Sequence, residues 1–478
     1  MTDLAGFLAL KPELLLCSAG TLVLLLDAFA PSTRKLFGAL SLAAVIGAAW
    51  LVLQQNAGSA FGGQLATDAV TQGFSLVVLV ATFLGVLASE GYLRREGILA
   101  GEYHALLLWC AVGLLLMLRA TELLTLFLAL ELLSLCLYAL AAYNRRSQLG
   151  TEAAIKYFLM GAFVSAFILL GIALLYGETQ STDLDAIAQA LAGGGVSVPV
   201  TALGILLLIA GFGFKMSLVP FHAWSPDTYQ GAPSPFVGFL SVAPKAASAV
   251  VLVRVLMAVS GGVLADKWSG VIAILSVLSM VAGNVLALVQ RDIKRMLAYS
   301  GIAHMGYLLL ALVTTDSSSW TPVWVYLLAY ALMNAGAFAV VTVLYPRSGE
   351  QHLISDLAGL GYQRRLLAAC LAVSMLSLGG IPPTFGFIGK YFVFLHAVEH
   401  GHVGLAIVGV LASLVGVFYY LRVVYTLYMK PGAEGAAQPG RDSWGELAAT
   451  LAAIATVVLG IWPWRFLGWM IDLLSGKS

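Results

Sequence analysis

The chain has 478 residues, of which 60% are hydrophobic and only 10% are charged, and its mean hydropathy is +0.93. A water-soluble domain of this length cannot expose so much apolar surface, so the composition excludes that class and predicts an all-α polytopic membrane protein. The net charge of +1 does not indicate nucleic-acid binding, and the informative charges are the few inside apolar segments.

Motifs for cofactors and catalytic metals are missing from the sequence. No GxGxxG, GxxxxGK[ST] or HExxH pattern occurs. The cysteines stand singly in apolar stretches, which favours buried small residues over a disulfide or a metal site; they are Cys17, Cys110, Cys136 and Cys370. We therefore expect no bound nucleotide, metal or other cofactor in this chain.

Apolar segments long enough to cross a bilayer recur along the chain, and cutting at charges, prolines and glycines leaves about fourteen of them. The N-terminus lacks the basic stretch and cleavage site of a signal peptide, so the first segment is predicted to be a retained span. The segments lie near residues 13–30, 35–54, 71–92, 103–119, 122–143, 152–176, 200–218, 233–258, 268–290, 295–314, 321–345, 366–398, 403–428 and 445–463.

Glu131 lies midway through the fifth segment, surrounded in sequence by leucines. A carboxylate in this position needs a counter-ion to stay charged, and we expect that counter-ion to be Lys215. A lysine with a movable acidic partner can load and release a proton as the pair opens and closes. The alternative is a structural ion pair that locks two helices. Ser134 and Tyr138 fall on the same helix face and could hold water there.

The seventh and eighth segments each carry a lysine beside a proline. Lys215 lies near the end of an apolar helix that is predicted to break at Pro220, and Lys245 follows Pro244 in the next helix. Each proline lacks an N–H and so leaves a helix carbonyl free to accept a hydrogen bond. A lysine at mid-span costs roughly 2.5 to 3.5 kcal/mol on insertion scales, so we expect partners or water for both; the alternative is that both ammonium groups snorkel to an interface.

The twelfth segment is too long for one straight span and contains the sequence GGIPP at 379–383, followed by Lys390. We predict a second broken helix there. Segments 4–8 then resemble segments 9–13 with opposite orientation, because five is odd, which indicates an inverted repeat of five helices. The predicted domains are an N-terminal part, two repeats and a C-terminal span, at residues 1–102, 103–258, 268–428 and 443–478.

Weaker candidates for proton relays lie near these segments. Lys156 is spaced i, i+4 from Glu152, which fits either a relay or an interfacial helix pair. His222 and His304 could relay protons because histidine titrates near physiological pH, although a satisfied buried histidine fits equally well. No role is expected for the histidines at segment ends or in loops, which are His104, His352, His396, His400 and His402.

Lysine and arginine residues are distributed unevenly between the two sides of the membrane. One side carries Lys11, Arg119, Lys267, Arg465 and Lys477. The other side, which should be cytoplasmic, carries Arg34, Lys35, Arg94, Arg95, Arg145, Arg146, Arg291, Lys294, Arg295, Arg347, Arg364, Arg365, Lys430 and Arg441. Both termini are therefore predicted to face away from the cytoplasm.

Four stretches of the chain resemble the antiporter-like membrane subunits of respiratory complex I and their Mrp-type sodium/proton antiporter relatives. They lie at 152–166, 211–247, 291–307 and 378–394, and include FHAWSPDTYQGAPSPF, RDIKRMLAYSGIAHMGY and LGGIPPTFGFIGKYFVF. No long lateral helix follows the last span as in the L type, and Lys390 stands where the M type has a glutamate. Within the family the chain is most similar to the N type.

The resemblance implies fourteen transmembrane helices, with the seventh and twelfth broken, and a proton path along the middle of the membrane. It implies that Glu131, Lys215, Lys245 and Lys390 carry this path, and Lys156 and His304 also fall on matching motifs. It further implies that NADH, FMN, iron–sulfur clusters and quinone are bound by partner subunits in a bacterial inner membrane.

Three functions remain open at this point. The first is proton translocation as a subunit of NADH:quinone oxidoreductase, driven by quinone reduction in partner subunits. The second is sodium/proton exchange in an Mrp-type antiporter, and the third is a membrane subunit of a related hydrogenase complex. A purely structural anchor is disfavoured by the three lysines and the glutamate inside apolar segments.

Overall fold

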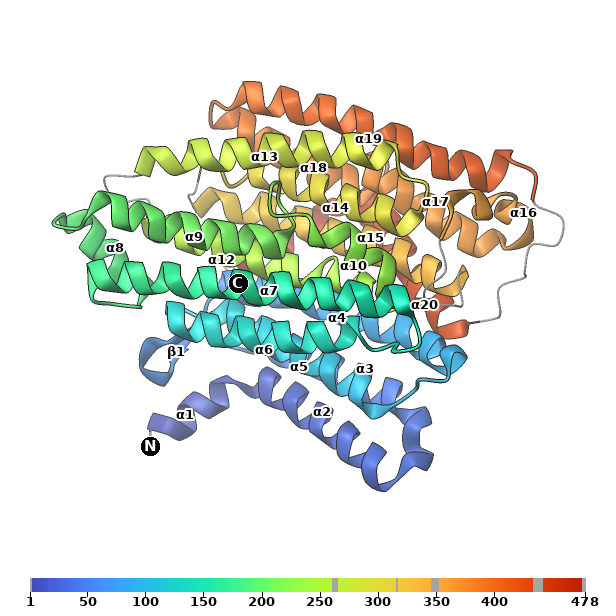
Figure 1. Cartoon of the computed structure of the whole chain (residues 1–478), viewed down its shortest axis with the longest axis horizontal. Helices are drawn as coiled ribbons and strands as arrows, with labels where there is room; N and C mark the ends of the chain where they lie inside the picture. Colours follow the sequence, from blue (N-terminus) through green and yellow to red (C-terminus); the bar gives the residue numbers. More distant parts are fainter. Residues whose placement is uncertain (1, 260–264, 315–316, 345–351, 433–441, 475–478) are drawn as a thin grey trace.

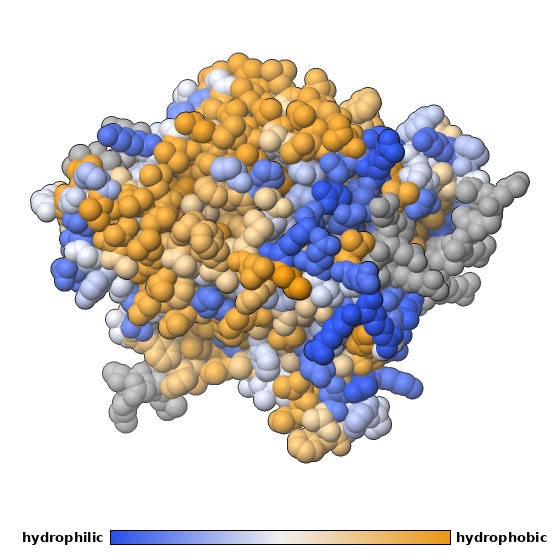
Figure 2. Space-filling model, viewed as in Figure 1, coloured by the Kyte–Doolittle hydropathy of each residue, from blue (hydrophilic) through white to orange (hydrophobic). Residues whose placement is uncertain are grey.

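The computed structural model describes residues 2–259, 265–314, 317–344, 352–432 and 442–474, and the chain forms long helices that run roughly parallel, horizontally in Figure 1. Among these residues, 12 helical segments are long and apolar enough to cross a membrane. The surface is broadly apolar on the face shown in Figure 2, as expected for contact with lipid. The predominantly helical membrane class is therefore confirmed.

The N-terminal part holds three of these long segments and a small hairpin that the sequence analysis did not predict. Asp68 caps the last helix, because its carboxylate accepts from the Thr71 N–H while the Thr71 hydroxyl accepts from the Asp68 N–H. The elements are α1 (Thr2–Ala9), α2 (Lys11–Phe29), a 3-10 turn (Pro31–Leu36), α3 (Phe37–Leu53), β1 (Gly58–Ala60), a 3-10 turn (Phe61–Gly63), β2 (Leu65–Thr67) and α4 (Ala69–Glu96), with β1 and β2 antiparallel.

The next part contains the first predicted break, and short helices replace a continuous span there. Its elements are α5 (Gly101–Arg119), α6 (Leu123–Ala141), α7 (Gln148–Thr179), the loop helix α8 (Leu184–Gly193), α9 (Val198–Met216), α10 (Trp224–Gly231), α11 (Ser234–Leu240) and α12 (Ala243–Val259). The eighth predicted segment is thus interrupted between α11 and α12, directly before Pro244.

The remaining part contains the second break and ends in two helices outside the proposed repeats. Its elements are α13 (Ala265–Leu288), α14 (Ile293–Leu310), a 3-10 turn (Ser317–Ser319), α15 (Trp320–Leu344), a 3-10 turn (Ile354–Leu357), α16 (Leu360–Gln363), α17 (Arg365–Gly379), α18 (Phe385–Glu399), α19 (Val403–Met429), α20 (Ser443–Ile461) and α21 (Pro463–Leu474). Neither α14 nor the broken pair α17/α18 belongs to the 12 membrane-length segments.

Both breaks begin in the same way. At Ser217 the backbone takes a left-handed φ of 62°, and the Leu218 N–H donates to the Gly213 carbonyl at 2.8 Å. At Gly380 φ is 77°, and the Ile381 N–H donates to the Leu376 carbonyl at 3.0 Å. These are helix ends of the Schellman type. The α9 helix therefore stops before Pro220, and Pro220 is not the residue that ends it.

The centre of the bundle is formed by α11, α12 and α15. The apolar stretches within Ser234–Val259 and Ser317–Leu344 are completely buried, whereas fewer than half of the residues in the apolar stretches of α7, α13 and α19 are buried. Because α11, α12 and α15 are buried, their polar groups must find partners within the protein.

Three of the cations from which the orientation of the chain was predicted, Arg347, Arg441 and Lys477, lie outside the described residues.

Candidate functional site

Four lysine side chains lie inside the helix bundle. Lys215, Lys245, Lys294 and Lys390 are each exposed by no more than 5% among the described residues. Their ammonium groups do not reach the surface of the chain, in contrast to the snorkelling alternative for Lys215 and Lys245. A buried ammonium is costly unless polar groups surround it, so the neighbours of each lysine indicate what it can do.

Lys215 lies in the last turn of α9 and faces α6. Its Nζ donates to Ser134 Oγ at 2.8 Å and lies 5.7 Å from the centre of the Tyr138 ring. Ser134 in turn donates to the Leu130 carbonyl at 2.6 Å, so its oxygen lone pairs are free for the lysine. The lysine therefore uses a side-chain hydroxyl, and no freed backbone carbonyl.

Glu131 points to a different helix from the one we expected. Its Oε1 accepts from Ser165 Oγ of α7 at 2.5 Å, and among the described residues it forms no ion pair with Lys215. Residues three apart on a helix differ by about 60° in direction, so Ser134 can face α9 while Glu131 faces α7. The expected pair is thus open in this structure, and Ser134 occupies the place beside Lys215.

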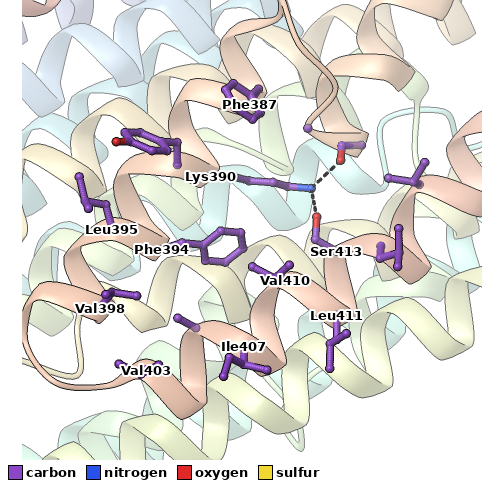
Figure 3. A pocket seen from close by; sticks show the side chains of 16 residues that line it. Phe387, Lys390, Phe394, Leu395, Val398, Val403, Ile407, Val410, Leu411 and Ser413 are labelled. Atoms are coloured by element: carbon purple, nitrogen blue, oxygen red, sulfur yellow. Dashed lines mark hydrogen bonds between the residues drawn. The ribbon is translucent and has the colours of Figure 1, made fainter.

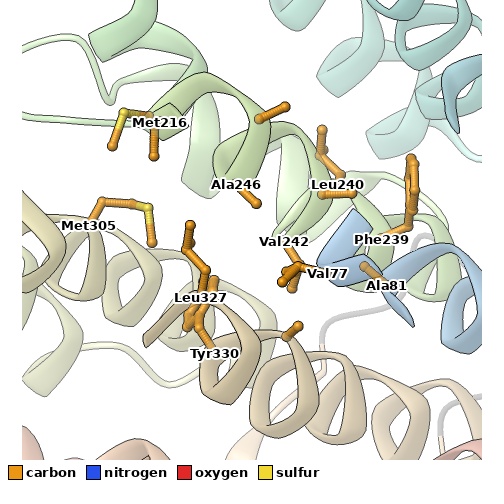
Figure 4. Close-up of a cluster of buried hydrophobic side chains, with 14 of the residues drawn as sticks. Val77, Ala81, Met216, Phe239, Leu240, Val242, Ala246, Met305, Leu327 and Tyr330 are labelled. Atoms are coloured by element: carbon orange, nitrogen blue, oxygen red, sulfur yellow. The ribbon is translucent and has the colours of Figure 1, made fainter. Parts of the chain in front are cut away.

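Lys245 is the third residue of α12, directly after the interruption that follows α11. Its Nζ makes no hydrogen bond to any described residue and lies 5.6 Å from the centre of the Tyr229 ring. Figure 4 shows Met216, Met305, Leu327 and Tyr330 among the buried side chains on the same side of α12 as Ala246, the next residue. The carbonyl of Leu240, which Pro244 leaves without its helix donor, does not bond the lysine, and the contact that the ammonium makes is with the aromatic ring of Tyr229.

A row of aromatic rings in contact connects the surroundings of Lys215 and Lys245. Phe214 packs against Trp224 with ring centres 5.3 Å apart, and Trp224 lies 6.4 Å from Tyr229. Trp224 Nε1 also donates to the Phe214 carbonyl at 2.9 Å, which attaches α10 to the end of α9. Trp224 and Tyr229 belong to the FHAW and DTYQ portions of the motif that follows α9, for which the sequence had suggested a family resemblance but no role for these rings.

His304 of α14 lies at the centre of a hydroxyl cluster and is 1% exposed. Its Nδ1 lies 2.6 Å from the Tyr326 hydroxyl, and its Nε2 lies 3.1 Å from the Tyr420 hydroxyl, which also bonds Ser300 Oγ. Lys245 Nζ lies one turn away, 3.0 Å from where a Cβ would stand at Gly301, and Lys390 Nζ lies 5.2 Å from the centre of the Tyr307 ring, which is 5.7 Å from the His304 ring. The histidine is therefore between two of the lysines, with a hydrogen-bond partner on each ring nitrogen.

Lys390 of α18 bonds the carbonyls left free at the second break. Its Nζ donates to Leu378 O at 2.9 Å, to Gly379 O at 3.1 Å and to Ser413 Oγ of α19 at 2.7 Å. Figure 3 shows the lysine reaching from α18 across the floor of a groove between α18 and α19. The groove has a volume of about 680 Å³ and is otherwise lined mainly by apolar side chains.

Lys156 and His222 lie nearer the surface than the other candidates. Lys156 Nζ forms ion pairs with Glu152 at 2.7 Å and with Asp227 of α10 at 3.0 Å. Asp227 also pairs with Arg295 of α14 at 2.7 Å. Figure 2 shows a hydrophilic band on this face of the molecule, in the region where Figure 1 places α10. His222, between α9 and α10, is partly buried.

Two buried polar groups were missed by the sequence analysis. Lys294, in the first turn of α14, donates to the Ala232 carbonyl at the end of α10 at 2.7 Å. Glu90 of α4 is 1% exposed, bonds Arg94 at 2.5 Å and lies 3.3 Å from Nε2 of His104, which is fully buried. Because His104 lies near a segment end, no role had been expected for it. The sequence did contain a signal for this buried pair, because Glu90 is an acidic residue within an apolar segment.

No group of three or more His, Cys, Asp or Glu side chains in the described part of the chain is arranged to hold a metal ion. The candidate site consists instead of lysines, a glutamate, a histidine and hydroxyl groups. Such groups can accept and release protons. They include Glu131 on α6, Lys215 on α9, Lys245 on α12, His304 on α14 and Lys390 on α18.

Residues 120–416 match the protein family described as NADH:quinone oxidoreductase/Mrp antiporter, transmembrane. The chain is 41% identical over 458 residues to the NADH-quinone oxidoreductase subunit N of Trichlorobacter lovleyi, which covers 95% of this chain and 94% of the relative. It is also 41% identical over 508 residues to the subunit of the same name from Myxococcus xanthus, which covers 98% of this chain and 97% of the relative.

Solved structures with the same fold come from several membrane complexes. A chain of respiratory complex I from Thermus thermophilus, solved with bound aureothin, matches with a TM-score of 0.81 and 35% identity, over 96% of this chain and 98% of that one. A chain of the Mrp complex from Dietzia matches with a TM-score of 0.82, over 98% of this chain and 97% of that one. The identity of 19% in the second case shows a common fold alone.

Proposed function

The chain belongs to the NADH:quinone oxidoreductase/Mrp antiporter family, among its N subunits, and from this premise we propose that its buried lysines carry the translocated protons. It is a proton-translocating membrane subunit of the proton-pumping NADH:quinone oxidoreductase, and it works beside other membrane subunits, including antiporter-like ones. The identity of 41% to N subunits favours this assembly over an Mrp antiporter or a hydrogenase complex.

The observation that carries the proposal is the position of three lysines at interrupted helices. Lys215 lies in the last turn of α9, Lys245 lies in the first turn of α12, and Lys390 lies one turn inside α18. None of these lysines forms an ion pair with a described carboxylate, so each ammonium can lose its proton without leaving a buried carboxylate unpaired. Broken helices supply polar backbone at membrane depth, where a regular helix offers none.

The proposed route begins at Glu131 and Lys215, continues to Lys245 and His304, and ends at Lys390. Ser134 holds the Lys215 ammonium while the pair with Glu131 is open, and closing that pair would change how tightly the proton is held. Lys156 and His222 are proposed as relays at the edge of the route, where protons enter from the aqueous side.

Energy for this transport must come from outside the chain. Moving one charge against 100 mV takes about 2.3 kcal/mol. We propose that NADH, FMN, iron–sulfur clusters and quinone are held by partner subunits, and that quinone reduction there changes the pairing of Glu131 and Lys215.

We further propose fourteen spans with an inverted repeat of helices 4–8 and 9–13, in a bacterial inner membrane. The matching helix ends at Ser217 and Gly380 support the repeat. The excess of lysine and arginine in the loops after odd-numbered spans supports a cytoplasmic location for those loops, with both termini on the opposite side.

The test is replacement of Lys245 by alanine in the complete complex, in inverted membrane vesicles. We expect NADH-driven quinone reduction and proton pumping to fall together, because a tightly coupled machine stops when its proton route is cut. A native gel establishes that the variant complex is assembled.

Lys430→Ala is the matched control, because Lys430 is an exposed lysine at the end of α19. It should leave both activities unchanged. Full turnover with normal pumping in assembled Lys245→Ala would disprove the role of Lys245, and loss of sodium/proton exchange alone would indicate an antiporter.

A further inference from the structure

Asn284 of α13 lies between the His304 cluster and Lys390 and has no role in the route described above. Its side chain is 2% exposed and lies near the C-terminal end of this apolar helix. The amide nitrogen donates to the Met280 carbonyl at 2.7 Å and to the Tyr307 hydroxyl at 2.8 Å. The amide oxygen accepts from the Tyr419 hydroxyl at 3.0 Å.

The orientation of this amide follows from its partners. A backbone carbonyl can only accept a hydrogen bond, so the group facing Met280 must be the NH2 group. The oxygen then faces Tyr419, which must donate its single proton to Asn284. Gly416 of α19 leaves room for this arrangement, since a Cβ there would lie 3.0 Å from the amide oxygen.

Hydroxyl groups extend from both sides of the amide. On one side, the rings of Tyr419 and Tyr420 lie 4.4 Å apart between their centres, and the Tyr420 hydroxyl bonds both Ser300 Oγ and Nε2 of His304. On the other side, the centre of the Tyr307 ring lies 5.2 Å from Lys390 Nζ, which donates to Ser413 Oγ. Side chains thus connect His304 to Lys390, and Asn284 is the one member of this connection that is neither a hydroxyl nor an imidazole.

This difference matters for proton transfer. A hydroxyl or an imidazole can take a proton at one lone pair and release another, but a neutral carboxamide holds both of its N–H protons and passes none along the chain. We propose that Asn284 is a positioning residue that interrupts this connection, so that a proton on the His304 cluster does not pass to Lys390 through fixed side chains. The proposal rests on the proposed roles of His304 and Lys390.

An aspartate at this position would complete the connection. Its protonated oxygen would release a proton to Tyr307 as its other oxygen took one from Tyr419. Tyr307 would pass its own proton by way of Ser413 to Lys390 in its neutral form, and Tyr419 would regain a proton from Tyr420, which would take the one held by the His304 imidazolium. At each hydroxyl one O–H bond breaks as another forms, one N–H bond is lost at His304 and one is gained at Lys390, and no further reactant is required. Transfer would then occur without the rearrangement that couples it to quinone reduction.

The experiment compares Asn284→Asp, Asn284→Ser and Asn284→Leu in the assembled complex, measured as protons pumped per NADH oxidised. Asp and Ser carry hydroxyl or carboxyl groups and should lower this ratio while quinone reduction continues. Leu has a similar volume without a proton to pass, and should keep the ratio while turnover falls. A purely structural role would lower turnover in all three variants without changing the ratio.

A wild-type ratio in both Asn284→Asp and Asn284→Ser, or the same decrease in Asn284→Leu, would overturn the proposal. Ser is smaller than Asn, so it tests the idea even where the charged variant fails to assemble. These results are distinct from failure of the proposed function, because that failure would appear as full activity of Lys245→Ala.

Discussion

At the scale of single residues, each buried lysine is solvated differently. All three lie over aromatic rings, but Lys215 also bonds one hydroxyl, Lys390 bonds two carbonyls and a hydroxyl, and Lys245 bonds no described group. Because the dipoles around an ammonium group stabilise its charge, the three lysines should differ in proton affinity. A graded series of proton affinities is what a route with a direction requires.

Replacing Ser134 by alanine removes the one hydroxyl that bonds the Lys215 ammonium. A hydrogen bond to a charged group contributes about 1.5–3 kcal/mol, so we expect quinone reduction and pumping to fall on the order of tenfold. The measurement is NADH-driven activity in vesicles. Ser134→Thr retains a hydroxyl and should restore most of the activity, whereas full activity of Ser134→Ala would show that Lys215 does not depend on this bond.

At the scale of elements, α10 is a short helix held at several points by its neighbours. Its C-terminal carbonyl at Ala232 accepts from Lys294, and Asp227 pairs with Lys156 and Arg295. Eight residues are too few for a helix that is stable by itself, so these contacts must keep it in place. The same helix carries Trp224 and Tyr229, which lie between Lys215 and Lys245.

Replacing Lys294 by methionine keeps most of the side-chain volume but leaves the Ala232 carbonyl without its described donor. We expect faster amide hydrogen exchange in α10 and slower quinone reduction, because the helix that positions Trp224 and Tyr229 is held less firmly. Arg291→Gln, an exposed cation just before α14, is the control and should change neither. Unchanged exchange in α10 of Lys294→Met would mean that other contacts are sufficient to hold this helix.

At the scale of the whole molecule, a largely buried ion pair joins α4, from the N-terminal part of the chain, to the start of α20, from the C-terminal part. Arg95 of α4 pairs with Asp442 at 2.5 Å, and this carboxylate also caps α20 by accepting from the Gly445 N–H at 3.0 Å. The two residues are 347 positions apart in the sequence. The pair closes the fold between its N-terminal and C-terminal parts.

Asp442→Asn retains a cap for α20 but removes the charge that Arg95 needs. We expect a loss of about 1.5–3 kcal/mol in the free energy of unfolding, seen as a lower temperature at which the complex disappears from a native gel. The pair of Arg364 with Glu446 is more exposed, so Arg364→Gln should cost less than about 1 kcal/mol. Equal effects of the two changes would contradict this ranking.

The sequence by itself determined the membrane class, the approximate positions of the apolar segments, the two broken regions and the lysines within them. These are local properties, because hydropathy, helix-breaking residues and an isolated charge can each be recognised within one span. Family resemblance added the assembly to which the chain belongs. The inverted repeat, the topology and the roles of the lysines stay predictions.

Only the tertiary structure decided which groups meet. Ser134 beside Lys215, the amide of Asn284 between two tyrosines, Lys294 at the end of α10 and His104 beside Glu90 all join different helices. Such contacts depend on how each helix is rotated about its axis and how deeply it packs, which no single span specifies. The expected pair of Glu131 and Lys215 was open for the same reason, since a difference of about 60° on one helix was enough to choose another neighbour.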